Sequence, residues 1–150
     1  MVLLWIGIAV ELGVVIVGLA IWSRGRKRRV LKEHTIEAEA LREMLEPEAR
    51  VLLFDVRQPL DVLAYSEMIP GAKRIAPKEV LENPSLIPRE QDVVVYCTCP
   101  GDKTSWQVLQ HARANHIARV KLLRGGLDAW KAKGYSVVPY KESFRLDTAS

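Results

Sequence analysis

The stretch VVVYCTCPGDKTS, residues 93–105, joins a β-branched apolar run to a segment with helical spacing and holds both cysteines of the 150-residue chain. The valines predict a buried strand, and Thr104 or Ser105 can cap the helix that follows. Between them, a proline and a glycine predict a loop. A loop of this kind directs backbone N–H groups and the positive end of a helix at a thiolate. The stretch therefore indicates sulfur or oxyanion chemistry.

Strand-like and helical segments alternate on both sides of this loop. Residues 51–54 are a continuous apolar run, typical of a strand buried on both faces of a parallel sheet. Upstream, Thr35 can cap a helix with an apolar stripe, and residues 60–66 predict another short helix. Residues 73–75 and 120–123 have the composition of further strands. This alternation predicts an α/β domain with a parallel sheet.

Residues 1–22 are apolar throughout except for Glu11 and three glycines. At about 1.5 Å per residue they span about 33 Å, close to the ~30 Å hydrocarbon core of a bilayer. Residues 23–33 are strongly basic, and nothing basic precedes the apolar run, unlike in a cleaved signal peptide. We therefore expect a retained transmembrane helix at 1–22 and a basic juxtamembrane linker at 23–33. The positive-inside rule puts the N-terminus outside and the remainder of this single-pass membrane protein in the cytoplasm.

Glu11 is an acidic residue within this expected membrane helix. Gly7 and Gly18 lie on the same helical face, so small residues flank the carboxyl group and allow another helix to approach. One interpretation is therefore a helix–helix oligomer through Gly7, Glu11 and Gly18. The other is a protonated carboxyl group in a helix that tolerates it.

The net charge of +4 arises entirely from residues 1–33, whereas residues 34–150 carry equal numbers of basic and acidic side chains. A nucleic-acid-binding domain is therefore not expected. Two cysteines one residue apart do not make a disulfide framework, and reduced thiols suit a cytosolic setting. Two ligands are also too few for a structural zinc site, so we expect neither a metal nor a cofactor.

Four motifs occur in order: FDVR at 54–57, IPGA at 69–72, the Tyr-Cys strand end at 96–97 and GGLDAW at 125–130. Together they resemble the single-domain rhodanese (thiosulfate sulfurtransferase) family over residues 34–140, leaving a polar tail at 141–150. The resemblance implies a five-stranded parallel sheet with helices on both faces, in which the active-site loop joins the central strand to a helix. The sequence departs from the family at Glu67-Met68, where a Gly-His pair is usual.

Some of these motif residues have structural interpretations of their own. Asp55 and Arg57 end a buried strand, and charged groups there must be paired to be tolerated, so we expect an ion-pair scaffold. Gly125 and Gly126 let the chain turn into a helix, which Trp130 packs onto the sheet.

In the resembled enzymes a cysteine takes the outer sulfur of thiosulfate as a persulfide and passes it to cyanide or a protein thiol. Two alignments compete for this nucleophile. Cys97 sits directly after the strand, whereas Cys99 has the usual spacing to the helix that follows. The strand frames Cys97 better, so we favour Cys97. The candidate substrate-binding positions follow the second cysteine: Gly101, Asp102, Lys103, Thr104 and Ser105.

The loop has no arginine, Asp102 is negative, and Lys103 is its only cation. The missing arginine disfavours a phosphatase of this fold. A membrane-anchored sulfurtransferase using thiosulfate or another persulfide donor and a thiol or cyanide acceptor is the leading interpretation. The alternative is a catalytically weak module acting as a sulfur-relay or protein-interaction domain at the membrane. The two cysteines could also act together, one resolving a persulfide on the other to a disulfide.

Overall fold

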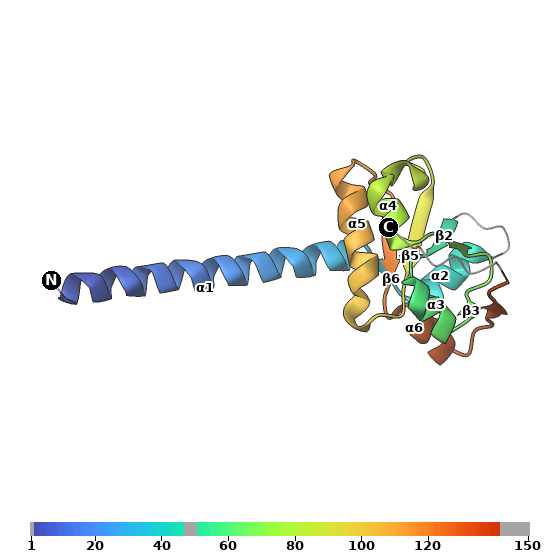
Figure 1. The fold of residues 1–150 in the computed structure, drawn as a ribbon, viewed down its shortest axis with the longest axis horizontal. Helices are drawn as coiled ribbons and strands as arrows, with labels where there is room; N and C mark the ends of the chain where they lie inside the picture. The colour runs from blue at the N-terminus through green and yellow to red at the C-terminus, as the bar shows by residue number, and fades with distance from the viewer. Residues whose placement is uncertain (1, 47–50, 142–150) are drawn as a thin grey trace. The chain divides into compact units, whose positions relative to one another are not determined.

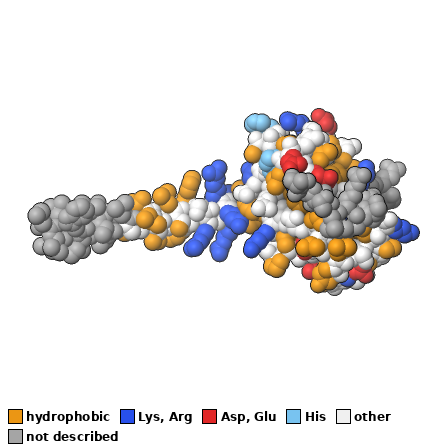
Figure 2. Space-filling view, in the orientation of Figure 1, with side chains coloured by type: hydrophobic (Ala, Val, Ile, Leu, Met, Phe, Trp, Pro, Cys, Tyr) orange, Lys and Arg blue, Asp and Glu red, His pale blue; other side chains and the backbone are white. Residues whose placement is uncertain are grey.

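The computed structural model describes residues 2–46 and 51–141, with side chains described from residue 13 onward. The chain divides into two units, Met1–His34 and Thr35–Ser150. The first is the continuous helix α1, Val2–Glu33 (Figure 1). In its described part the apolar side chains of residues 14–17, 19, 21 and 22 are exposed. Figure 2 shows lysine and arginine side chains gathered around the helix directly after this apolar section.

Within the described residues, no helix combines the length and the apolar character needed to cross a bilayer. The transmembrane helix predicted at 1–22 is therefore not supported there, although the side chains of residues 1–12 lie outside the described part. The predicted contact through Gly7 and Glu11 also lies outside it. Gly18 is described, and a Cβ atom at this position would meet nothing within 4 Å.

The second unit is built on a five-stranded sheet in the order β1-β6-β5-β2-β4, with every neighbouring pair parallel. The predicted five-stranded parallel sheet is therefore confirmed, and β5 is its central strand. The strands are β1 Thr35–Ile36, β2 Val51–Asp55, β4 Lys73–Arg74, β5 Asp92–Tyr96 and β6 Val120–Leu123.

Helices cover both faces of this sheet (Figure 1). Alternate residues of β5 point to opposite faces, as the period of a strand requires. Val94 and Tyr96 pack in one core cluster with Leu41 and Leu127. Val93 and Val95 face the other side, which α4 and α5 cover. The helices are α2 Ala38–Leu45, α3 Pro59–Ala64, α4 Pro77–Glu82, α5 Lys103–Ala114 and α6 Gly126–Ala132, with short 3₁₀ turns at Pro84–Leu86 and Pro100–Asp102.

The expected helix cap at Thr35 is wrong. Thr35–Ile36 forms the edge strand β1 and pairs with Leu122 and Leu123 of β6. Pairing with a neighbouring strand satisfies the backbone groups of these residues, a long-range interaction that local capping chemistry does not reveal. The helix begins at Ala38 instead, and the apolar stripe still reaches the core, where Leu41 is fully buried.

A second, two-stranded antiparallel sheet pairs β3, Glu67–Met68, with β7, Val138–Pro139. Glu67 also forms an ion pair with Lys131 of α6. Glu67 and Met68 thus attach the segment after α3 to β7 and to α6.

Asp55 and Arg57 form the expected ion pair, and both side chains are completely buried. The Arg57 Nε atom donates to both carboxylate oxygens of Asp55, each at 2.9 Å. Its terminal nitrogens donate to the carbonyl oxygens of Tyr65 at 2.7 Å and of Glu67 at 2.9 Å. The guanidinium therefore fixes the chain between α3 and β3 as well as neutralising Asp55.

Tyr96 extends this network into the central strand. Its hydroxyl donates to Asp55 Oδ2 at 3.1 Å and accepts the Ile69 N–H at 3.3 Å. Burial raises the pKa of Tyr96 far above its ordinary value, so the hydroxyl stays protonated and keeps donating. The residue directly before Cys97 is thus tied to two other segments.

Replacing Asp55 by alanine is expected to lower the free energy of unfolding by about 3–5 kcal/mol, because Arg57 would remain buried without its counterion. Urea denaturation of the full chain followed by circular dichroism measures the loss. The control is Glu82→Ala, which removes the exposed ion pair with Lys78 and should cost at most about 1 kcal/mol. Equal losses in the two variants would contradict a structural role for the buried pair.

Candidate active site

The two cysteines lie at the carboxyl end of the central strand. Cys97 follows β5 directly and is 1% exposed, whereas Cys99 is partly exposed. Gly101 and Asp102 both have positive φ angles, 68° and 53°, which turn the chain back toward the sheet. The Asp102 N–H donates to the Cys99 carbonyl oxygen at 3.1 Å, and α5 begins at the next residue. The cap expected at Thr104 or Ser105 is therefore wrong, because both residues lie inside α5 and Asp102 holds the N-cap position. The loop is therefore a short turn that brings a helix N-terminus back to the strand end.

The N-terminus of α5 is directed at Cys99. The Thr104 N–H donates to the Cys99 sulfur at 3.2 Å, and the Thr104 hydroxyl lies 3.4 Å from the same atom. The sulfur atoms of Cys97 and Cys99 are 2.8 Å apart and share a hydrogen bond. Three polar groups thus converge on one sulfur, as a thiolate or persulfide requires.

The two thiols differ in acidity. Burial raises the pKa of Cys97 to about 11, and donation of its proton to Cys99 acts in the same direction, whereas the nearby Ser105 hydroxyl and N–H oppose it. At Cys99, partial burial alone would raise the pKa. The hydrogen bonds with Cys97 and with the Thr104 hydroxyl and N–H outweigh it and leave the pKa of Cys99 below its ordinary value. Cys99 is therefore the better thiolate of the pair.

The double-glycine turn before α6 supports the backbone of Cys97. A Cβ atom at Gly126 would lie 1.7 Å from the Cys97 carbonyl oxygen, so only glycine fits there. The Leu127 N–H donates to that oxygen at 3.2 Å. Trp130 is buried in the core, in agreement with its expected packing role. The strand end that carries Cys97 is thus held by the start of α6.

The Asp102 side chain makes a hydrogen bond outside its own loop. Its carboxylate accepts the Gly125 N–H at 3.1 Å, which joins the cysteine loop to the turn after β6. Burial raises the pKa of Asp102, although this hydrogen bond and the charge of Arg124 act against the rise. Of the other predicted substrate-binding residues, Thr104 lies at Cys99, Ser105 is buried beside Cys97, and Lys103 is exposed at the first position of α5.

Cys99 opens into a hollow of about 480 Å³ at the surface. One wall is the loop itself. The other is α6, a wall that the sequence interpretation missed although the carboxyl ends of parallel strands share one edge of a sheet. Asp128 of α6 adds a second acidic residue to the lining, besides Asp102 of the loop. The hollow is lined by Thr98, Cys99, Pro100, Gly101, Asp102, Gly125, Asp128, Ala129 and Ala132.

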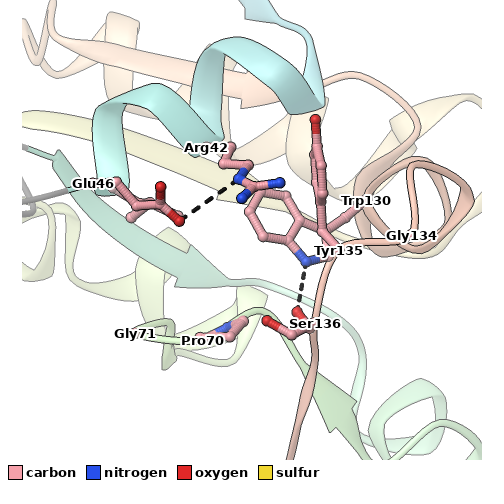
Figure 3. Close-up of a pocket in the computed structure, with 9 residues that line it drawn as sticks. Arg42, Glu46, Pro70, Gly71, Trp130, Gly134, Tyr135 and Ser136 are labelled. Atoms are coloured by element: carbon pink, nitrogen blue, oxygen red, sulfur yellow. Dashed lines mark hydrogen bonds and ion pairs between the residues drawn. The ribbon is translucent and has the colours of Figure 1, made fainter.

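A second cavity, of about 470 Å³, has no cysteine in its lining (Figure 3). Arg42 of α2 lies over the Tyr135 ring at 4.7 Å, and Trp130 meets the same ring edge-on with centroids 4.8 Å apart. The Trp130 indole N–H donates to the Ser136 carbonyl oxygen at 2.9 Å. The residues that line this cavity therefore also hold the chain after α6 against α2.

The model of the rhodanese-like domain family matches residues 37–133 of the chain. This is a rhodanese-family protein. A sulfurtransferase of Allochromatium vinosum is 33% identical over 103 residues, covering 69% of this chain and 92% of the relative. The match covers most of that sulfurtransferase and supports a sulfurtransferase-like role for this chain.

Solved structures with this fold include a rhodanese-related protein of Thermoplasma volcanium, with a TM-score of 0.58 at 22% identity, covering 70% of this chain and 97% of that one. The rhodanese-like domain of an Anabaena protein gives a TM-score of 0.60 at 24% identity, with 78% and 92% covered. A Lactobacillus plantarum protein gives 0.64 at 17% identity, with 77% and 96% covered. At these identities the likeness establishes the fold alone.

At neutral pH, iodoacetamide is expected to modify Cys99 well before Cys97, because the alkylating agent reacts with thiolates and only Cys99 combines exposure with a lowered pKa. Peptide mass spectrometry over a time course measures the order. Modification of Cys97 should become comparable only as the pH approaches about 11, the pKa of that thiol. Simultaneous modification of both cysteines in the folded chain at pH 7 would contradict the assigned acidities.

Proposed function

We propose that this rhodanese-like protein is a sulfurtransferase in which Cys99 carries the transferred sulfur as a persulfide. The sequence interpretation favoured Cys97. The observation that moves the proposal to Cys99 is the hydrogen bond from the Thr104 N–H to the Cys99 sulfur. Cys97 is 1% exposed, so a donor molecule in solution reaches Cys99 first.

In the proposed reaction the Cys99 thiolate attacks the outer sulfur of thiosulfate. The bond between the two sulfur atoms of thiosulfate breaks, sulfite leaves with the electron pair, and a persulfide forms on Cys99. A nucleophile such as cyanide or a thiol then takes the outer sulfur and regenerates the thiolate. The Thr104 N–H and the N-terminus of α5 stabilise the anionic sulfur in both steps. Lys103, exposed at the same helix end, supplies the cation for an anionic donor.

The charges around the hollow bear on the choice of donor. Asp102 and Asp128 both contribute carboxylates to its lining, and the loop 97–105 contains no arginine. Like charges disfavour the thiosulfate dianion, so turnover with thiosulfate is expected to be low and a less highly charged persulfide to be a better donor. This feature favours the second candidate function, a sulfur relay to or from a protein partner with little free turnover.

Incubation with thiosulfate is expected to add about 32 Da, the mass of one sulfur, to the loop peptide of Cys97→Ser but not of Cys99→Ser. With cyanide present, Cys99→Ala should lose thiocyanate release entirely. Mass spectrometry and a colorimetric thiocyanate assay provide the two readouts. Ser66→Ala, an exposed substitution on the segment after α3, is the control and should match the wild type. If no variant carries the adduct and the wild type releases no thiocyanate, thiosulfate sulfurtransferase activity is excluded.

We further propose that the apolar N-terminal segment holds the domain at a bilayer, with the basic residues 24–32 on the cytoplasmic side. The exposed apolar side chains of α1 at residues 14–22, followed by a basic cluster, support this proposal. Such a location would hold the cysteine loop near sulfur donors or acceptors at the membrane surface.

A double variant, Val15→Lys with Leu19→Lys, is expected to release the full chain from bacterial membranes into the soluble fraction after an alkaline wash. On insertion scales a lysine costs about 2.5–3.5 kcal/mol at the centre of a membrane helix and less toward its ends, and the double variant places two of them in one helix. Both positions are exposed on α1. Leu60→Lys, at an exposed position on α3, is the control and should leave the distribution unchanged. A wild-type chain found wholly in the soluble fraction would contradict anchoring.

A further inference from the structure

We propose that Cys97 is a resolving cysteine, which attacks the persulfide on Cys99, releases hydrogen sulfide and leaves a disulfide between Cys97 and Cys99. This step rests on the proposed function, because it begins from the Cys99 persulfide. It turns sulfur transfer into a reductive reaction whose product is sulfide.

The distance between the two sulfur atoms supports this step. They lie 2.8 Å apart, within the van der Waals separation of two sulfur atoms, so the Cys97 sulfur is already next to the inner sulfur of a persulfide on Cys99. Reacting atoms held this close convert a bimolecular step into an intramolecular one. An external thiol would first have to enter the hollow.

The surroundings of Cys97 restrict what it can react with. Its side chain is buried, and its carbonyl oxygen is held by the Leu127 N–H under Gly126. The backbone that carries this thiol therefore cannot swing outward to solution. Within the described part of the chain, the Cys97 thiol contacts the sulfur atom of Cys99. A cysteine placed in this way is suited to an internal partner and poorly suited to a donor from outside.

The step balances in atoms and electrons. A bond forms between the Cys97 and Cys99 sulfurs, and the bond between the Cys99 sulfur and the outer sulfur breaks. The outer sulfur leaves with the electron pair and takes the proton of Cys97, giving hydrogen sulfide. The Cys97 thiol is oxidised and the outer sulfur is reduced, so no external oxidant is needed.

Turnover requires reduction of the resulting disulfide. A dithiol reductant of the thioredoxin chemical class would supply two electrons and two protons, become a disulfide itself and restore both cysteines. The sum is thiosulfate plus a dithiol giving sulfite, hydrogen sulfide and a disulfide. Cyanide or an acceptor thiol competes with Cys97 for the same persulfide.

The test uses the full chain, reduced and freed of reductant, then mixed with thiosulfate alone. The wild type is expected to release about one sulfide per chain and to lose about 2 Da as the disulfide forms, instead of retaining a gain of about 32 Da. Cys97→Ser should keep the 32 Da adduct on Cys99 and release no sulfide. Cys99→Ser should show neither change. Methylene blue formation measures sulfide, and intact mass measures the chain.

A comparison of two substitutions separates resolution from positioning. Cys97→Ser keeps a hydrogen-bond donor beside Cys99, so persulfide formation should be faster in this variant than in Cys97→Ala. Cys97→Ala removes that donor, so persulfide formation should slow as well. Neither variant should release sulfide. Circular dichroism confirms that both variants are folded, and each serves as a check on the other.

Three results would overturn the proposal in different ways. If the wild type retains the 32 Da adduct as Cys97→Ser does and no sulfide appears, Cys97 does not resolve the persulfide although the sulfurtransferase function stands. If neither the wild type nor Cys97→Ser acquires sulfur and no sulfide forms, the sulfurtransferase function fails and the resolving step fails with it. Sulfide released by Cys97→Ser at the wild-type rate would also exclude the step.

Discussion

The buried ion pair between Asp55 and Arg57 organises the carboxyl edge of the sheet. Charged groups are tolerated inside a protein only with partners for their charge and for their hydrogen-bonding atoms. Asp55 obtains these from Arg57 and from the Tyr96 hydroxyl, and Arg57 from Asp55 and two backbone carbonyl groups. Strands β2 and β5 and the segment around β3 thus meet at one network. Because Tyr96 immediately precedes Cys97, that network also fixes where the cysteine loop begins.

From this fixed origin, the cysteine loop, the N-terminus of α5 and the turn after β6 form the site. The loop turns back through two residues with positive φ angles and brings Thr104 to Cys99. The turn after β6 contacts the loop at two points. Gly126 packs against the Cys97 carbonyl oxygen, and the Gly125 N–H donates to the Asp102 carboxylate. The two thiols therefore differ in access: Cys97 is enclosed by protein, whereas Cys99 lines an open hollow. Burial raises the pKa of both thiols, but at Cys99 the hydrogen bonds with Cys97 and Thr104 outweigh it, so only Cys99 has a pKa below its ordinary value.

Much of the fold could be predicted from the sequence, because apolar runs and turn residues report directly on strands and loops. The parallel sheet and the pairing of Asp55 with Arg57 follow from such patterns. Thr35 was misassigned because a two-residue edge strand is defined by its partner, β6, and not by its own composition. The sequence did not predict the pairing of β3 with β7 for the same reason. Both errors concern contacts between residues far apart in the chain.

The site was predictable as a loop, but not in its internal arrangement. Spacing alone left Cys97 and Cys99 as competing nucleophiles, because the strand argued for one and the helix for the other. The contact between Gly126 and the Cys97 carbonyl oxygen has a wider consequence for this scaffold. The cysteine loop and the start of α6 are fitted to each other, so the loop is not an exchangeable cassette. Transplanting it into another rhodanese framework would require moving the double-glycine turn along with it.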